Sequence, residues 1–156
     1  GKNNYWNSVY INSLTLANAI NGGETVKRHP NVWYNENYVY LYGKIVRKIY
    51  VPVISNGKDK LLFFVLRNDN VDVGITKILV NDVLVERLTT NYFNSYSRHH
   101  NSRPFGLYVA SKVPASLIPK GARFINVTVD NTNSEEDEDG FHIRKVGTHD
   151  FYPNAE

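Results

Sequence analysis

The side chains best suited to chemistry are concentrated in one stretch of the sequence, residues 92–108, where aromatic rings alternate with imidazole, guanidinium and amide groups. Rings offer flat apolar faces to a sugar or a base, Arg offers a planar fork for carboxylate or phosphate, and Asn both donates and accepts hydrogen bonds. Such a mixture favours recognition over catalysis. The candidate ligand-binding residues of this loop are Tyr92, Tyr96, Arg98, His99, His100 and Arg103.

Two other features invite a metal or cofactor interpretation. His99 and His100 are adjacent, so in an extended chain their side chains point in opposite directions, whereas zinc motifs space their ligands more widely. An acidic run at 135–139 resembles part of a calcium loop, but an EF-hand counted from Asp130 would need Gly where Glu135 stands. We therefore expect no metal or cofactor, and keep Asp137 and Asp139 as the candidates if calcium binds.

Further aromatic residues have two interpretations. Tyr38, Tyr40 and Tyr42 would share one face of a strand and could form a stacking platform, although such stripes more often pack against a second sheet or a partner subunit. Trp33 and Tyr34 join the candidate ligand-binding residues with the same alternative. For them, and for Trp6, burial is the favoured interpretation.

Sequence motifs of known enzyme classes are absent. The chain has no Gly-X-Ser-X-Gly elbow, phosphate-binding loop, His-Glu-X-X-His motif or paired carboxylates near a histidine. His149 with Asp150, or His142 with the acidic run, could form an acid/base pair in three dimensions, but the sequence gives no reason to choose either. We predict that the protein is not an enzyme.

Short apolar and alternating segments dominate the rest of the chain. Residues 38–45 alternate between aromatic and aliphatic side chains, 60–67 form an apolar run typical of a strand buried on both faces, and 75–80 with 83–88 flank the two turn residues Asn81 and Asp82. We expect further strands at residues 9–16, 32–34, 49–54, 106–113, 124–130 and 141–146. Short helices are expected only at 14–20 and 114–118.

Many short strands joined by polar loops predict an all-β fold, an antiparallel β-sandwich or jelly roll with at most one or two short helices. At 156 residues, without an internal repeat or an interdomain linker, the chain should form a single domain spanning 1–156. Because the sequence contains no Met, we expect this domain to be one module of a larger protein.

The charge is unevenly distributed. The formal net charge is +3, but five of the 15 acidic residues lie in the run 135–139, so the other positions carry 18 basic against ten acidic residues. Such a surface could attract anionic polymers. No stretch approaches the roughly 20 apolar residues of a membrane span, and no basic cluster suits nucleic acid. We expect neither a membrane nor a nucleic-acid partner.

Two segments resemble known families. Residues 33–45 resemble the Val-Tyr-Leu-X-Gly-X-Ile strand of tail-fibre and receptor-binding domains from phages that infect Gram-positive bacteria. Residues 117–129, followed by 140–143, are similar to the closing strands of jelly-roll carbohydrate-binding modules, in which a Pro-X-Gly turn precedes a core strand. The resemblance implies a non-enzymatic sandwich, often trimeric in phage fibres, that docks on teichoic acid or surface polysaccharide.

The leading prediction is a binding module for cell-surface carbohydrate or cell-wall polymer, located in a phage tail or outside the cell. One alternative is an assembly domain that contacts other subunits of a tail or surface complex, for example in a homotrimer. A second alternative is an accessory domain of a polysaccharide-degrading enzyme.

Overall fold

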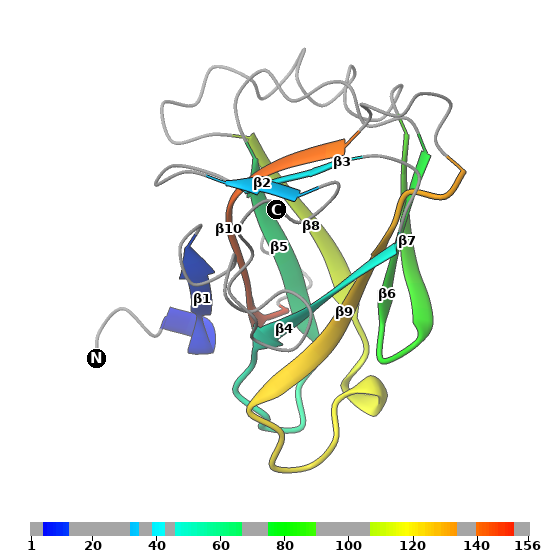
Figure 1. The fold of residues 1–156 in the computed structure, drawn as a ribbon. Helices are drawn as coiled ribbons and strands as arrows, with labels where there is room; N and C mark the ends of the chain where they lie inside the picture. The colour runs from blue at the N-terminus through cyan, green and yellow to red at the C-terminus, as the bar shows by residue number, and fades with distance from the viewer. Residues whose placement is uncertain are drawn as a thin grey trace.

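The computed structural model describes residues 5–12, 32–34, 39–42, 46–66, 75–89, 107–133 and 140–151. In these residues the chain forms two antiparallel sheets that pack face to face, with only two single turns of 3-10 helix, η1 (Tyr5–Asn7) and η2 (Ala115–Leu117) (Figure 1). The all-β antiparallel sandwich predicted from the sequence is therefore confirmed. The extent of the domain, 1–156, stays a prediction.

One sheet has six strands, and β10 organises it. Its strands are β1 (Val9–Asn12), β2 (Val32–Tyr34), β3 (Val39–Tyr42), β5 (Lys60–Leu66), β8 (Leu107–Val113) and β10 (Gly140–Asp150). The order is β2-β3-β10-β5-β8, and β1 pairs with the last part of β10. The long β10 can serve β3 and β1 on the same edge because it pairs with β3 over 140–143 and with β1 over 145–148.

The other sheet has four strands in the order β4-β9-β6-β7. They are β4 (Val46–Pro52), β6 (Ile75–Val80), β7 (Val83–Thr89) and β9 (Phe124–Asp130). The predicted hairpin is confirmed, because Asn81 and Asp82 join β6 to β7 with φ values of 48° and 69°. Asn and Asp tolerate this left-handed backbone better than most residues, which is why the pair marked the turn in the sequence.

Most predicted strands lie where alternation placed them. Strands β2 and β9 coincide with the predicted ranges. Strand β5 has a partner strand on each edge, and it buries Leu62, Phe64 and Leu66 on its inward face and Phe63 on its outward face. Two predictions were inaccurate at the ends. The fourth strand begins at Val46 rather than at residue 49, and β10 continues to Asp150 rather than ending at 146. Both extensions carry charged residues, which an apolar pattern does not register. The predicted helix at 14–20 lies outside the described residues.

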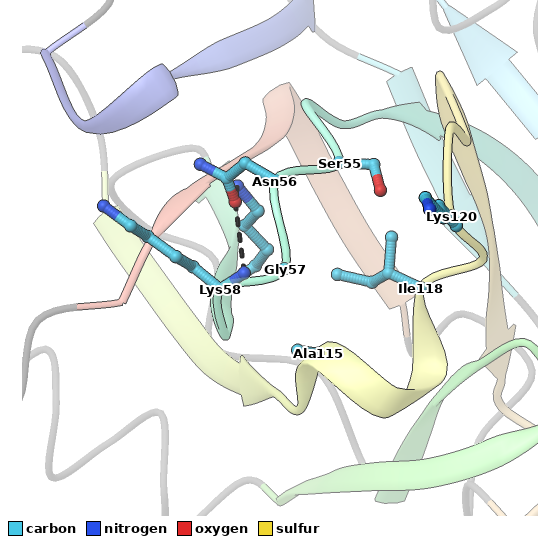
Figure 2. Close-up of a pocket in the computed structure, with 8 residues that line it drawn as sticks. Ser55, Asn56, Gly57, Lys58, Ala115, Ile118 and Lys120 are labelled. Atoms are coloured by element: carbon cyan, nitrogen blue, oxygen red, sulfur yellow. Dashed lines mark hydrogen bonds between the residues drawn. The ribbon is translucent and has the colours of Figure 1, made fainter.

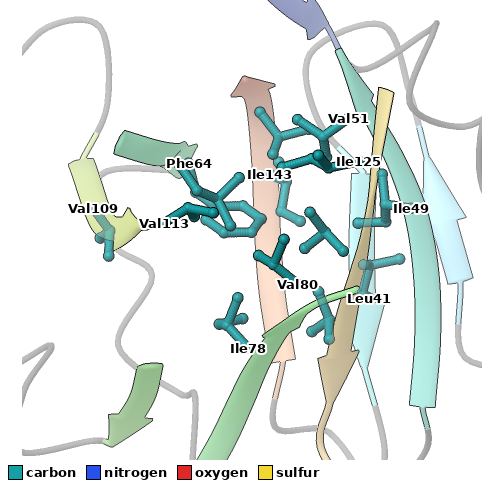
Figure 3. Packing of buried hydrophobic residues seen from close by; sticks show 14 of the residues in the cluster. Leu41, Ile49, Val51, Phe64, Ile78, Val80, Val109, Val113, Ile125 and Ile143 are labelled. Carbon is teal, nitrogen blue, oxygen red and sulfur yellow. The ribbon is translucent and has the colours of Figure 1, made fainter. Parts of the chain in front are cut away.

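The core fills the space between the sheets. From β3, Val39 and Leu41 point inward, which confirms the aliphatic face predicted for this strand. Figure 3 shows the two layers interdigitating, with residues of β5, β8 and β10 against residues of β4, β6 and β9. The fully buried members include Ile49, Val51, Leu62, Leu66, Ile78, Val80, Val113, Val127, Ile143 and Val146.

Strand β1 approaches β10 closely at Gly147. A Cβ added there would meet the Val9 carbonyl oxygen and would lie 2.6 Å from the Cβ of Tyr10. Only glycine leaves room for this approach. Gly147 therefore allows β1, and the residues that precede it, to dock on the six-stranded sheet.

The described residues contain neither a membrane-spanning helix nor a cluster of metal ligands. No helix among them is long and apolar enough to cross a membrane. No group of three or more His, Cys, Asp or Glu side chains within the described ranges is placed to hold a metal ion. The calcium candidates Asp137 and Asp139 lie outside these ranges.

Candidate functional site

Four rings gather on the outward face of the six-stranded sheet, and we call them the aromatic cluster: Trp6, Phe63, Tyr108 and His149. Phe63 stacks on Tyr108 with ring centroids 5.6 Å apart and lies 5.7 Å from His149. The Trp6 and His149 ring centroids are 6.1 Å apart. These separations are typical of aromatic pairs that stabilise each other.

Strand alternation and register bring the three sheet residues together. Phe63 points away from the core because Leu62 and Phe64 on either side of it point inward. Its directly opposite neighbours are Ala110 on β8 and Gly147 on β10, and both are small. The longer side chains of Tyr108 and His149, one step diagonal in the register, therefore have room to lean over the Phe63 ring.

Hydrogen bonds define the protonation pattern of His149. Its Nδ1 lies 2.8 Å from the backbone carbonyl of Asp150, which can only accept, so Nδ1 carries a proton. In the neutral ring Nε2 is then an acceptor, and the Tyr108 hydroxyl, 3.0 Å away, donates to it. The imidazole and phenol are thus locked in one orientation relative to each other.

Trp6 reaches the cluster through an unusual backbone. Trp6 and Asn7 have φ values of 58° and 55°, in the left-handed region that bulky residues rarely adopt. The Asn7 side chain anchors this turn by donating a 2.8 Å hydrogen bond from Nδ2 to Asp150. Backbone strain of this kind persists only where the surroundings impose it, and here it holds a large ring, 43% exposed, at the surface.

Lysines and further rings border the cluster on the same outward face. Lys145 Nζ lies 4.8 Å from the centre of the exposed Tyr10 ring, and Lys112 Nζ lies 4.8 Å from that of Phe151. Both distances are within the range of cation–π attraction. The face therefore combines apolar ring surface, neutral hydrogen-bonding groups and positive charge at two margins.

This arrangement suits a polyhydroxylated ring better than a purely apolar ligand. Tyr108 is 38% exposed, so part of it can be reached from solvent. Aromatic faces contact the C–H groups of a sugar, while phenol and imidazole groups exchange hydrogen bonds with its hydroxyls. The aromatic cluster is the described surface with the strongest binding chemistry.

On the opposite face of the same strands lies a buried polar network. Lys60, the first residue of β5, forms an ion pair with its register partner Asp150, and both side chains are 1% exposed. Asn56 accepts from Lys60 Nζ at 2.9 Å and donates to Asp150 at 3.3 Å. Lys58 approaches the same carboxylate at 3.8 Å. With Asn7, these residues satisfy the Asp150 carboxylate almost entirely from side chains.

The network shifts the titration of Asp150. Burial by itself would raise the pKa of this carboxyl, because desolvation disfavours the charged form. Hydrogen bonds from Lys60, Asn7 and Asn56, together with the Lys60 charge, oppose this effect. Their combined influence is larger, so the pKa of Asp150 lies below its ordinary value of 3.8.

A pocket of about 470 Å³ opens beside this network, at the end of the sandwich where the β4–β5 and β8–β9 connections lie (Figures 1 and 2). We call it the lysine pocket. Figure 2 shows Asn56 and Lys58 on one wall, Ser55 and Lys120 on another, and Ile118 between them. Its lining residues are Ser55, Asn56, Gly57, Lys58, Lys60, Ala115, Ile118 and Lys120.

The structure leaves the predicted ligand loop untested. Tyr92, Tyr96, Arg98, His99, His100 and Arg103 lie outside the described residues. Trp33 and Tyr34 belong to β2, where only the backbone is described, and the same holds for Tyr40 and Tyr42 on β3; Tyr38 lies outside the described ranges. For all of these residues ligand binding stays a prediction.

Two interpretations from the sequence are corrected. Burial was favoured for Trp6, but its left-handed backbone keeps the ring partly exposed. His149 and Asp150 do not form an acid/base pair, because consecutive side chains of a strand point to opposite faces. The imidazole joins the aromatic cluster, whereas the carboxylate joins the buried network. The second suggestion, His142 with the acidic run, lies outside the side chains described.

Sequence reasoning missed Phe63, Tyr108 and His149 as a group because they lie on three strands that are far apart in sequence. A signal was available for one of them. Tyr108 is the last residue of the aromatic stretch 92–108 and lies on the predicted strand 106–113. The sequence does not show that this strand pairs with the strand that carries Phe63.

Comparisons with known proteins add information on the fold. No protein-family model matches the sequence, and no curated protein is significantly similar to it. Among solved structures, the C-terminal CBM6 module of the marine laminarinase LamC from Zobellia galactanivorans superposes with a TM-score of 0.52 at 10% identity, covering 92% of this chain and 99% of that module. At this identity the likeness shows a shared fold, the jelly-roll sandwich of a carbohydrate-binding module.

A second structure, CBM35 from Paenibacillus barcinonensis, gives a TM-score of 0.46 at 12% identity over 92% of this chain and 99% of that one. A TM-score below 0.5 supports no conclusion about this chain. The chain thus has the fold of the LamC module.

Proposed function

We propose that this domain is a non-catalytic binding module that recognises cell-surface carbohydrate or cell-wall polymer, and that the aromatic cluster contacts the sugar. The observation that carries the proposal is the group of interlocked rings on an outward sheet face, with Trp6 and Tyr108 partly exposed. The fold shared with the CBM6 module of LamC supports it.

A binding role fits the order of the cluster. The Tyr108 hydroxyl, the His149 ring and the backbone of Asp150 form one chain of hydrogen bonds, and Phe63 supports it from below. Groups held in this way lose little conformational freedom on binding. The separation of His149 from the Asp150 carboxylate also supports a binding role, because the carboxylate that is adjacent in the sequence is engaged by Lys60.

The finer assignments follow from the resemblance in the sequence. Host attachment by a phage tail, teichoic acid as the receptor and a virion or cell-surface location stay predictions. So does attachment to a polysaccharide-degrading enzyme, for which the origin of the LamC module in a laminarinase offers a parallel.

The proposal is tested by measuring affinity for surface glycans and comparing variants. After a glycan array or cell-wall panel identifies a ligand, titration calorimetry compares the intact protein with the double variant Trp6→Ala, Tyr108→Ala. We expect affinity to fall at least about tenfold, because each aromatic contact contributes about 0.5–1.5 kcal/mol beyond its buried area and 1.4 kcal/mol corresponds to a factor of ten.

Matched controls come from the other sheet and from the predicted loop. Tyr50→Ala with Phe124→Ala removes two rings of similar exposure from the outward face of the four-stranded sheet and should leave affinity unchanged. Tyr96→Ala with Arg98→Ala tests the loop. If only the loop variant lost binding, the aromatic cluster would not be the sugar site. If no glycan bound, the proposed function itself would be wrong.

A second candidate function, assembly with other subunits, is favoured by the outward face of the four-stranded sheet. Large exposed apolar side chains lie on three of its strands: Val46, Tyr50, Leu84 and Phe124. Exposed apolar surface of this kind often marks a protein interface. Light scattering separates the two functions, because a stable oligomer that binds no glycan would favour assembly.

A further inference from the structure

We propose that the lysine pocket is a second binding site, specific for a phosphate monoester, and that it is independent of the aromatic cluster. The two sites lie on different parts of the sandwich: the cluster is on the outward face of the six-stranded sheet, and the pocket is at the end where the chain passes between sheets. The proposal does not depend on the aromatic cluster binding sugar.

Charge decides the class of ligand. Three lysines line the pocket: Lys58, Lys60 and Lys120. Asp150 lies against them and pairs with Lys60 and Lys58. A second carboxylate, Asp59, accepts a hydrogen bond from the Ala115 N–H of the pocket wall but pairs with Lys112, so it leaves the balance unchanged. The balance is two positive charges. A phosphate monoester carries about −1.5 to −2 at pH 7, so it matches this excess, whereas a carboxylate would leave part of it unbalanced.

The buried pair of Lys60 and Asp150 cancels its own charge, so the excess rests on Lys58 and Lys120. Lys60 cannot swing into solvent, because its ammonium is held by Asp150 and by Asn56 at 2.9 Å. Lys58 and Lys120 are exposed and stand on opposite sides of the pocket; the Lys58 side chain extends away from it in Figure 2 and has to turn inward to reach a ligand there. Lys120 follows Pro119 in the β8–β9 connection, and Lys58 follows Gly57, which has a φ of 78°.

Hydrogen bonds between the two connections give the pocket a fixed shape. The Ala115 N–H donates to the Asp59 carboxylate at 2.8 Å, and the Ser55 hydroxyl donates to the Pro119 carbonyl at 3.2 Å. From the hairpin, Asn81 donates to the Leu117 carbonyl at 2.6 Å. The walls are therefore tied to each other and to the four-stranded sheet before any ligand arrives.

The apolar lining residues determine which group attached to the phosphate the pocket can hold. Ile118 and Ala115 form an apolar side, and the volume of about 470 Å³ lies within the range of about 300–1,000 Å³ usual for small-molecule sites. The pocket can hold a free phosphate, or a phosphate with one sugar ring against Ile118. Phosphate is the chemistry common to both.

The test is a titration followed by amide NMR, with inorganic phosphate, glucose 6-phosphate, glucuronate and glucose as probes. We expect both phosphates to shift the amide signals of residues 55–58 and 115–120 in the intact protein, and glucose to shift none of them. Tighter binding of glucose 6-phosphate would show that the apolar side contacts the ring. Equal affinities would show that the phosphate alone is recognised. Glucuronate binding as tightly as phosphate would overturn the charge argument.

Two double variants remove the same charge from different places. Lys58→Gln with Lys120→Gln should weaken phosphate binding at least about tenfold, because charge-assisted hydrogen bonds are the strongest polar contacts. Lys48→Gln with Lys77→Gln, on the outward-facing positions of the four-stranded sheet, should leave it unchanged. Equal losses in both variants would mean that phosphate responds only to net charge. An absence of binding to the intact protein would also overturn the proposal, whatever the glycan experiments show.

Discussion

His149 and Asp150 are neighbours in the chain, yet one belongs to an aromatic cluster at the surface and the other to a buried polar network. His149 faces outward, where it contacts the Trp6 and Phe63 rings and the Tyr108 phenol. Asp150 faces inward, where an ammonium and two amides hold it 1% exposed. The outward side offers contacts to a partner. On the inward side the polar groups contact one another.

The difference shows how one pair of strands can serve stability and recognition separately. The Lys60 to Asp150 network fixes the start of β5 against the end of β10, and so fixes the strands that carry Phe63 and His149. Through Asn7 it also holds the turn that presents Trp6. Changes on the inward side should therefore alter stability first, and changes on the outward side should alter binding first.

The largest effect is expected from Asp150→Asn, which keeps the shape of the side chain but removes its charge. It leaves the Lys60 ammonium buried without a counter-charge, and such losses cost about 3–5 kcal/mol of unfolding free energy. Urea denaturation measures the change. The matched control Asp82→Asn removes an exposed ion pair to Lys48, with N and O 4.0 Å apart, and should cost below about 0.5 kcal/mol.

The same comparison is sharpened by replacing both partners. In the double variant Lys60→Met, Asp150→Leu no buried charge remains, so it should be more stable than Asp150→Asn alone. A double variant that is less stable than the single one would mean that the network contributes through its hydrogen bonds to Asn7 and Asn56 rather than through charge balance.

Gly147→Ala should affect both sides of the comparison. The new methyl group would meet the Val9 carbonyl and the Tyr10 Cβ, so β1 must move away from β10. We expect a loss of about 1–3 kcal/mol in unfolding free energy and weaker glycan binding, because Trp6 lies just before β1. Gly121→Ala is the control: its φ of 77° makes alanine strained, but no atom lies within 4 Å of the new Cβ. It should cost stability without changing glycan affinity.

Acid should weaken the inward side. The pKa of Asp150 is lower in the folded than in the unfolded chain, so its contribution to stability is fully present above the unfolded value of 3.8 and is lost as the pH falls through the folded value. Unfolding free energy measured from pH 6 downwards should therefore decrease, and the slope should be smaller in Asp150→Asn. An identical slope in that variant would show that other carboxylates dominate the pH dependence.

The sequence allowed the strands to be predicted better than the sites. Alternation located the core face of β3, and the Asn81 and Asp82 pair located a hairpin, because both signals are local. The aromatic cluster depends on register: Phe63 lies opposite Ala110 and Gly147 only after β5 has paired on both edges. No local pattern carries that information.

The burial of Lys60 could not be predicted from the sequence for a related reason. Lys60 opens an apolar run, and a lysine at a strand end is normally expected to reach solvent. It is buried because Asp150, 90 positions away, arrives directly opposite with the complementary charge. A sequence pattern can locate either residue on a strand, but only the pairing of β5 with β10 shows that each makes the burial of the other possible.

The smallest effect on stability is expected from Tyr108→Phe, which removes one hydroxyl from the outward side. The phenyl ring can keep its stacking on Phe63, and the net contribution of the lost hydrogen bond to His149 is about 1 kcal/mol or less at a partly exposed position. Binding should respond more, because His149 Nε2 loses its donor and a sugar hydroxyl loses a partner. Calorimetric titration should therefore show weaker glycan affinity in Tyr108→Phe, whereas Tyr50→Phe on the other sheet should show none of this change. Equal affinity of Tyr108→Phe and the intact protein would mean that the ring, and not its hydroxyl, makes the contact.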